Sequence, residues 1–373
     1  MATITGPIDV SALRARLDRA STAAEQAGVD ALLISPGSDL RYLIGAGGDS
    51  FERLTCLALP VGGTPTLVVP KLEQPGYAGI PTDELGVEVV TWVDGEDPYA
   101  LVKAAVKGDR TAVADMMPAL HTIKLGNAIG GKQSLAGPII RELRMRKDAS
   151  EIDALRKAGQ AIDRVHARMG EFLRVGRTER EVAKDIAAAI VEEGHTFADF
   201  VIVGSGPNGA SPHHRDSDRV IEAGEVVVID IGGPVAEGYN SDSTRTYVMG
   251  EPKHDDVWDT YAVLQAAQKA AVEAVKPGVT CEQIDAVART VIADAGFGEF
   301  FVHRTGHGIG LDVHEEPYIV SGNALPLEAG MAFSVEPGIY LPGRWGARIE
   351  DIVVATENGV ESFNNRPHEL VVL

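Results

Sequence analysis

Cysteine is nearly absent from this 373-residue sequence, which contains only Cys56 and Cys281 and no Cys-x-x-Cys pair. A disulfide framework or a thiolate metal site would need more cysteines or a closer spacing. We therefore expect both thiols to be reduced residues of the core or the surface. This cysteine usage favours a cytoplasmic location.

Long apolar runs and basic residues are scarce as well. No apolar run reaches the ~18 residues that a membrane span requires, and residues 1–7 lack the basic and apolar regions of a signal peptide. We therefore expect a soluble globular protein without a membrane partner. The 34 Lys and Arg residues against 54 Asp and Glu give a formal net charge of −20, which would repel a phosphate backbone and argues against a nucleic-acid partner.

The first part of the chain alternates helical and strand-like stretches and has no cluster of candidate metal ligands. Apolar periodicity predicts an amphipathic helix over residues 10–28. Strands are expected over residues 30–35, 54–60, 66–70, 87–92 and 111–115. We predict a mixed α/β accessory domain over residues 1–138 and a catalytic domain over residues 139–373.

The second part opens with a helix predicted over residues 148–174, where Asp148 and Glu151 have the spacing of a capping box. A weak repeat follows, because residues 175–182 and 277–284 carry the same helix-start signal at an offset of 102 residues. Each copy precedes two strands that carry a carboxylate. The repeat predicts two α+β halves related by pseudo-two-fold symmetry, with metal ions held between their sheets.

Four carboxylates and one histidine are the candidate metal ligands. They are Asp230, Asp242, His307, Glu336 and Glu350, each in a strand-like or Gly-rich stretch. A carboxylate within an apolar strand costs on the order of several kcal/mol unless it is paired, and metal ions would pair with all four. Oxygen-rich ligand sets suit Mn²⁺, Mg²⁺ or Fe²⁺, and one imidazole also admits Co²⁺ or Zn²⁺. Two cations ~3.5–4 Å apart can activate a water between them and polarise a carbonyl, which indicates hydrolysis.

Strand alternation orients the residues around Glu350. Arg348, Glu350 and Ile352 share one face of the predicted strand, and Asp351 lies on the other. We therefore expect Arg348 beside the metals and a structural or solvated role for Asp351.

The order of the five ligands, with the segments at 303–310 (HRTGHGIG), 335–340 (VEPGIY) and 348–351 (RIED), resembles the pita-bread, M24-type metallopeptidases. These include methionine aminopeptidase, aminopeptidase P and prolidase. The resemblance covers the whole chain, because residues 1–138 are similar to the creatinase-type domain of the proline-specific branch. Methionine aminopeptidases lack that domain and usually carry Gln where Arg348 stands.

The resemblance implies a pita-bread catalytic domain that hydrolyses Xaa-Pro bonds in short peptides through a metal-bridging hydroxide. It also implies a homodimer and two divalent metal ions, with Mn²⁺ preferred over Co²⁺ or Zn²⁺. Actinobacterial Xaa-Pro dipeptidases and aminopeptidases are the most similar, and we favour the dipeptidase. Asp230 would chelate one metal and His307 the other. Asp242 and Glu350 would bridge them, and Glu336 would be a ligand and base.

Four further residues take roles by the same resemblance. His213 would help protonate the leaving proline nitrogen, and His314 would steady the oxyanion or the substrate carbonyl. His303 and Arg348 would line the substrate pocket.

One departure concerns the ligand spacing. Asp230 and Asp242 are 12 residues apart, whereas most relatives have 11. A one-residue bulge in the intervening turn would preserve the geometry, and otherwise Asp242 would face the wrong side.

Several alternatives stay open. A non-catalytic binding protein on this fold should have lost ligands, yet none is missing, and the intact ligand set also argues against metal-free creatine hydrolysis. The role of His214 is solvent-facing or supporting rather than catalytic, and Arg344 either binds a peptide carboxylate or sits in a loop. The glycines at 306, 308 and 310 indicate close backbone packing rather than a nucleotide loop. The other histidines, His121, His166, His195, His254 and His368, are expected to be ordinary core or surface residues.

Overall fold

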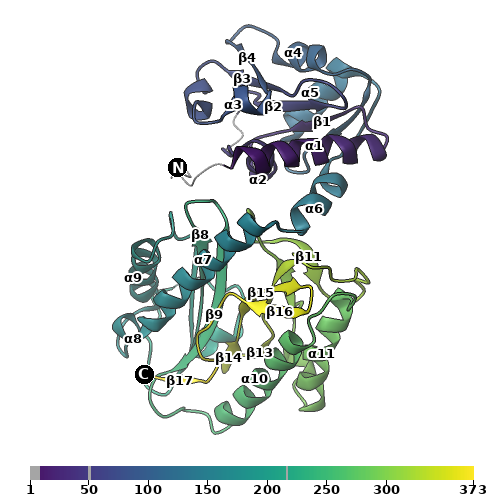
Figure 1. Ribbon diagram of the computed structural model, residues 1–373. Coiled ribbons are helices and arrows are strands. Elements are labelled where there is room, and N and C mark those ends of the chain that lie inside the picture. Colours follow the sequence, from purple (N-terminus) through teal and green to yellow (C-terminus); the bar gives the residue numbers. More distant parts are fainter. Residues whose placement is uncertain (1–8, 49–51, 216) are drawn as a thin grey trace. The chain divides into compact units, whose positions relative to one another are not determined.

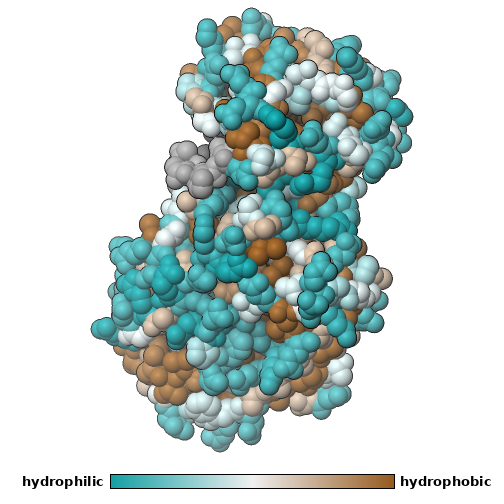
Figure 2. Space-filling view, viewed as in Figure 1, coloured by the Kyte–Doolittle hydropathy of each residue, from teal (hydrophilic) through white to brown (hydrophobic). Residues whose placement is uncertain are grey.

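The computed structural model describes residues 9–48, 52–215 and 217–373, which form two compact units (Figure 1). The units divide between Arg144 and Met145, within helix α6 (Gly137–Met145). The domain boundary expected at 138/139 lies at the start of this helix and stays a prediction. No helix among the described residues is both long and apolar enough to cross a membrane. In Figure 2, hydrophilic side chains cover most of the visible face of each unit, because the larger apolar side chains form the cores.

The N-terminal unit is a mixed α/β domain around a six-stranded sheet with strand order β4-β3-β2-β1-β5-β6. The strands are β1 (Ala31–Ile34), β2 (Cys56–Pro60), β3 (Thr66–Pro70), β4 (Glu88–Trp92), β5 (Arg110–Val113) and β6 (Lys132–Leu135). β2 runs antiparallel to β1 and β3, and the other pairs are parallel. The five strands expected from the sequence are all present, and β6 is additional.

Helices flank this sheet. They are α1 (Val10–Gln26), α2 (Ser38–Ile44), α3 (Thr82–Leu85), α4 (Pro98–Ala105) and α5 (Ala119–Ile129), with the 3-10 turn η1 (Gln74–Tyr77). α1 begins where the Asp9 carboxylate accepts hydrogen bonds from the amides of Ser11 and Ala12. Its buried Leu13 and Leu17 recur at the helical period, as the amphipathic pattern predicts.

The C-terminal unit contains two α+β halves. The first packs α7 (Ala149–Ala167), α8 (Met169–Phe172) and α9 (Glu179–Glu192) on a sheet of order β17-β9-β8-β7. Its strands are β7 (Phe200–Ser205), β8 (Val226–Pro234), β9 (Asn240–Val248) and β17 (Val371–Val372), and the 3-10 turn η2 (Gly206–Ala210) follows β7.

The second half packs α10 (Val257–Glu273) and α11 (Cys281–Asp294) on a sheet of order β11-β10-β12-β15-β16 and on the pair β13-β14. Its strands are β10 (Gly306–Gly308), β11 (Glu315–Ile319), β12 (Ala332–Val335), β13 (Gly338–Leu341), β14 (Trp345–Arg348), β15 (Asp351–Thr356) and β16 (Gly359–Ser362), and the 3-10 turn η3 is Gly298–Phe300. The helices of the two halves lie on opposite sides of the unit in Figure 1.

The helix starts follow the sequence signals, but one helix end does not. Capping boxes form at Asp148 before α7, at Thr178 before α9 and at Thr280 before α11. The helix predicted to reach residue 174 is interrupted, because the amide of Arg168 bonds to the carbonyl of Val165, three residues back instead of four. α8 then forms separately.

The β8–β9 hairpin answers the question of ligand spacing. Nine residue pairs run without a bulge from Val226↔Val248 to Pro234↔Asn240, so the extra residue interrupts neither strand. The extra length lies in the turn, where Val235 bonds to Tyr239 and Gly238 adopts φ 87°. A glycine in that left-handed conformation is typical of three-residue hairpin loops.

Candidate metal centre

The first half of the C-terminal unit supplies two carboxylates from the middle of buried strands. Asp230 on β8 pairs with Thr244 on β9, and Asp242 on β9 pairs with Gly232 on β8. Asp230 and Gly232 are two residues apart and share a face, as do Asp242 and Thr244. Both carboxylates therefore point to the same side of the hairpin.

The second half supplies two carboxylates at strand ends. Glu336 directly follows β12 and Glu350 directly precedes β15, next to the pair Val335↔Asp351. The Glu350 amide donates to the carbonyl of Thr244 over 3.1 Å, and the Thr244 hydroxyl donates to the Glu350 carboxylate over 2.7 Å. Glu350 thus connects the sheets of the two halves.

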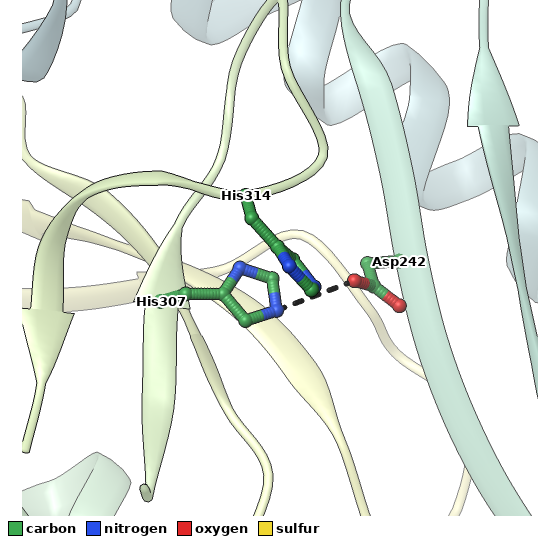
Figure 3. A group of neighbouring side chains, drawn as sticks. All are labelled: Asp242, His307 and His314. Carbon is green, nitrogen blue, oxygen red and sulfur yellow. Dashed lines mark ion pairs between the residues drawn. The ribbon is translucent and has the colours of Figure 1, made fainter. Parts of the chain in front are cut away.

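His307 on β10 points toward the carboxylate of Asp242 (Figure 3). Its Nε2 lies 3.2 Å from Glu336 Oε1 and 3.5 Å from Asp242 Oδ2. The ring of His314 stands beside it, with ring centroids 3.9 Å apart. The neighbouring Gly306 and Gly308 lie so close to the backbone of Ser334 and Glu316 that a Cβ would collide, which agrees with the expected close packing.

Ligand atoms of all five predicted residues come together in overlapping groups. The groups are Asp230 with Asp242 and Glu350, His307 with Glu336 and Glu350, and Asp242 with His307 and His314. Within each group the ligand atoms lie within 4.8 Å of one another. The third group includes His314, which was expected from the sequence to contact substrate. Its ring nitrogen lies close enough to the ligand atoms of Asp242 and His307 to share a metal ion with them.

The carboxylates fit divalent cations on two observations. Among the described residues, Asp230 Oδ1 and Glu350 Oε1 are buried without a hydrogen-bond partner. Burial, together with repulsion from neighbouring carboxylates, raises the pKa of Asp242 and Glu350 well above the usual values. Burial alone would also raise the pKa of Glu336, but His307, His303 and Arg348 outweigh it and lower that pKa. Unpaired oxygens and mutual repulsion are what cations would relieve.

All nine predicted site residues line one cavity of about 690 Å³. The other lining residues were not singled out from the sequence: Asp199, Phe200, Ile202, Pro212, Arg304 and Val313. Phe200 and Ile202 on β7 pair with Gly232 and Asp230, so they lie on the same face of the sheet as the Asp230 carboxylate. Their spacing of two residues shows from the sequence that they share a face, but only the strand pairing shows which face it is. Arg304 stands within the segment that carries His303 and His307.

Tyr340 on β13 links two of the predicted pocket residues and was missed. Its hydroxyl lies 2.8 Å from His303 Nε2 and 2.8 Å from Arg348 Nη1. Arg348 also bonds to Asp230 Oδ2 over 2.6 Å. Burial alone would lower the pKa of Arg348, but Tyr340 and Asp230 raise it, so the guanidinium stays charged against the carboxylates.

Two histidines face the cavity with little support from hydrogen bonds. Burial and the nearby His307 lower the pKa of His314 to about 4, so its ring is neutral near pH 7 and has one N–H to donate. His213 is exposed on the cavity wall. Both rings are therefore open to a bound substrate.

The residues whose roles the sequence left open, Arg344, His214 and Asp351, do not line the cavity. Arg344 forms an exposed ion pair with Asp256, with an N–O distance of 2.9 Å, and it is not among the lining residues. His214 contacts the buried carboxylate of Glu179 over 2.7 Å. Asp351 pairs with Arg245 over 2.7 Å, the structural role expected for it.

Comparison with known proteins identifies the chain's relatives. Residues 16–146 match the creatinase/prolidase N-terminal domain, and residues 153–357 match metallopeptidase family M24. The "Probable dipeptidase PepE" of Mycobacterium tuberculosis is 59% identical over 367 residues, covering 98% of each chain. The Xaa-Pro dipeptidase of Lactobacillus delbrueckii subsp. lactis is 36% identical over 371 residues, covering 96% of this chain and 98% of the relative.

A solved structure gives the same picture for the fold. The dipeptidase PepE of Mycobacterium ulcerans superposes with a TM-score of 0.94 at 61% identity, covering 98% of this chain and 99% of the other. The resemblance inferred from the sequence is thus confirmed, and so is the α+β catalytic domain preceded by a mixed α/β domain. The chain belongs to metallopeptidase family M24 and carries a creatinase/prolidase N-terminal domain.

Proposed function

We propose that this protein is a dinuclear-metal exopeptidase that hydrolyses Xaa-Pro dipeptides. The observation that carries the proposal is the convergence of the five ligand side chains in one cavity with His213, His303, His314 and Arg348. The dipeptidase activity agrees with the names of both relatives, and the specificity for proline rests on the name of the Lactobacillus delbrueckii relative, an Xaa-Pro dipeptidase.

Two divalent cations fit the ligand groups. Asp230 would hold one ion and His307 with Glu336 the other, while Asp242 and Glu350, each shared by two groups, would bridge them. When bound, such ions lower the pKa of a water and polarise the substrate carbonyl. The four carboxylates supply the oxygen ligands that hard cations prefer.

The protein's own groups would handle the protons. Glu336, whose lowered pKa keeps it ionised near neutral pH, would accept a proton from the attacking water. His314 would donate its N–H to the oxygen of the scissile carbonyl as negative charge develops there. His213 would deliver a proton to the proline nitrogen as the C–N bond breaks, so that the products are an amino acid and proline. His303 and Arg348, joined by Tyr340, would form the pocket wall.

We also propose the finer properties expected from the sequence. Mn²⁺ as the metal is supported by the oxygen-rich ligand set. A cytoplasmic location is supported by two free cysteines, both buried. A homodimer is supported by the family resemblance. A domain boundary at 138/139 is supported by the Gly-rich and Pro-rich sequence there.

The test compares Ala-Pro with Ala-Pro-Ala as substrates of metal-stripped protein reloaded with Mn²⁺ or Co²⁺. We expect turnover of Ala-Pro, none of the control dipeptide Pro-Ala, and none by Asp242→Asn. Preference for Ala-Pro-Ala would make the protein an Xaa-Pro aminopeptidase. No cleavage of either proline substrate, with two metal ions bound, would contradict the proposal and favour a binding protein.

A further inference from the structure

The segment that carries His213 is residues 211–215, which follow η2. Among the described residues no hydrogen bond reaches the His213 ring, which stands exposed on the cavity wall. The ring's position is therefore set by how its chain neighbours are held. For a group that must meet a substrate atom, a displacement of about 1 Å can cost ~100-fold in rate.

A buried carboxylate behind the cavity wall holds this segment. Glu179, the first residue of α9, has no exposed surface. Its Oε1 accepts from the amide of Ser205 over 2.8 Å and from the Ser205 hydroxyl over 2.7 Å. Its Oε2 is 2.7 Å from both the Ser217 hydroxyl and His214 Nε2. The Asn208 side-chain amide lies 3.1 Å from both oxygens.

These contacts keep the carboxylate charged and fully occupied. Burial alone would raise the pKa of Glu179, but the hydrogen bonds from Ser217, Ser205 and His214 outweigh it and lower that pKa. An ionised acceptor makes stronger hydrogen bonds than a neutral one. Glu179 therefore binds residues on both sides of the segment, Ser205 and Asn208 before it and Ser217 after it, as well as His214 within it.

The helix itself does not require this carboxylate. The start of α9 is already closed by the capping box between Thr178 and Glu181. All the side-chain hydrogen bonds described for Glu179 go instead to residues 205–217.

The residue on the other side of His213 is tied to the proposed active site. The carbonyl of Pro212 accepts from Arg348 Nη1 over 3.4 Å, and Arg348 also binds Asp230. His213 thus stands between Pro212, held by a pocket residue, and His214, held by Glu179.

We propose that Glu179 is a positioning residue for the reaction, acting through His214 to fix where the His213 ring meets the leaving proline nitrogen. The inference rests on the proposed function, in which His213 acts on that nitrogen. Glu179 does not line the cavity, so the proposal makes turnover depend on a residue outside it.

The first experiment is a double-mutant cycle on Ala-Pro turnover with Glu179→Gln and His213→Ala. We expect Glu179→Gln to lower kcat about 10- to 100-fold with little change in KM, melting temperature or metal content. In the His213→Ala background the same change should have little further effect, because the residue it positions is gone. The matched control is Glu181→Gln, in the same helical turn, which should keep kcat near wild type.

A second pair of variants keeps the test decisive if Glu179→Gln does not fold. His214→Ala should reproduce the kcat loss, and His214→Gln should restore most of it, because a glutamine amide can donate where Nε2 does. Additive losses in the double mutant, or equal activity of the two His214 variants, would overturn the proposal.

The failure of the proposed function would look different. A wild-type protein inactive on Ala-Pro, or a fully active His213→Ala variant, would remove the reaction or the role on which the inference rests. An active wild type with an impaired His213→Ala and a silent Glu179→Gln would overturn the positioning role alone.

Discussion

The cavity concentrates negative charge, because four of its candidate metal ligands are carboxylates. Four carboxylates, from Asp230, Asp242, Glu336 and Glu350, belong to overlapping groups of potential metal ligands, and all but the half-buried Glu336 are buried. Arg348 offsets part of this charge through its bond to Asp230. Two divalent cations would contribute four positive charges against four negative ones, which explains why the protein can bury so many acids together.

Asp242 is the residue at which this explanation is most easily tested. Asp242→Asn keeps the shape of the side chain but removes a charge shared by two ligand groups. Loss of a residue that only supports a ligand costs about 10- to 100-fold in metal affinity, so we expect at least that loss here and a matching drop in activity. Metal titration by calorimetry measures the affinity. Glu237→Gln, at the turn of the same hairpin, is the control and should bind as wild type, and an Asp242→Asn variant that keeps wild-type affinity would exclude the bridging role.

At the scale of elements, a buried histidine joins α7 to β9. His166 Nδ1 lies 3.0 Å from the Tyr247 hydroxyl and its Nε2 lies 3.2 Å from the carbonyl of Ser243. Burial and the charge of Arg245 lower the pKa of His166 to about 3. The ring is thus neutral in the folded protein between pH 5.5 and 7.5.

This pKa makes stability depend on pH with a definite sign. As the pH falls below ~6.5 the unfolded chain takes up a proton at His166 that the folded chain does not, so acid favours unfolding. Between pH 7.5 and 5.5 wild type should lose about 1.4 kcal/mol more than His166→Gln. Urea unfolding at both pH values measures this difference. The pKa of His195 is lowered to about 4, mainly by burial, so His195→Gln should also lose less unfolding free energy than wild type. Equal losses of unfolding free energy in wild type, His166→Gln and His195→Gln would refute the argument.

Element boundaries show how far local sequence reaches. The capping boxes at Asp148, Thr178 and Thr280 were predictable because each signal spans only four residues. The end of α7 was not, because the nearest glycine, Gly170, lies within α8 and Arg168 itself is an ordinary helix-forming residue. Its side chain instead bonds to Glu192 and Glu193 near the end of α9, partners that periodicity in α7 does not reveal.

At the scale of the whole molecule, all described groups of potential metal ligands lie in residues 145–373. The unit before Arg144 has its own sheet and buried strands. Metal binding should therefore stabilise only one of the two units.

Thermal unfolding tests this division. We expect two transitions by calorimetry, of which only one rises when Mn²⁺ replaces EDTA. A metal at 100 times its Kd adds about 2.7 kcal/mol per site, or roughly 5–10 °C for a unit of this size. In Asp242→Asn, Mn²⁺ should raise the midpoint of the metal-sensitive transition by less than in wild type. The midpoint of the other transition should not change. A metal-induced rise of both transitions, or of neither, would contradict the division.

The sequence by itself determined the two-part α/β and α+β organisation and the helix starts, and it predicted the set of five candidate ligands that the fold brings together. These were accessible because each is a local anomaly, such as a charged residue in an apolar strand or a cap before a periodic run. Only the tertiary structure decided that Tyr340 joins His303 to Arg348, that Glu179 holds the His213 segment and that Arg344 pairs with Asp256 away from the cavity. Each of these facts depends on side-chain contacts across turns and strand pairs, and no local periodicity encodes which side chains such folding brings together.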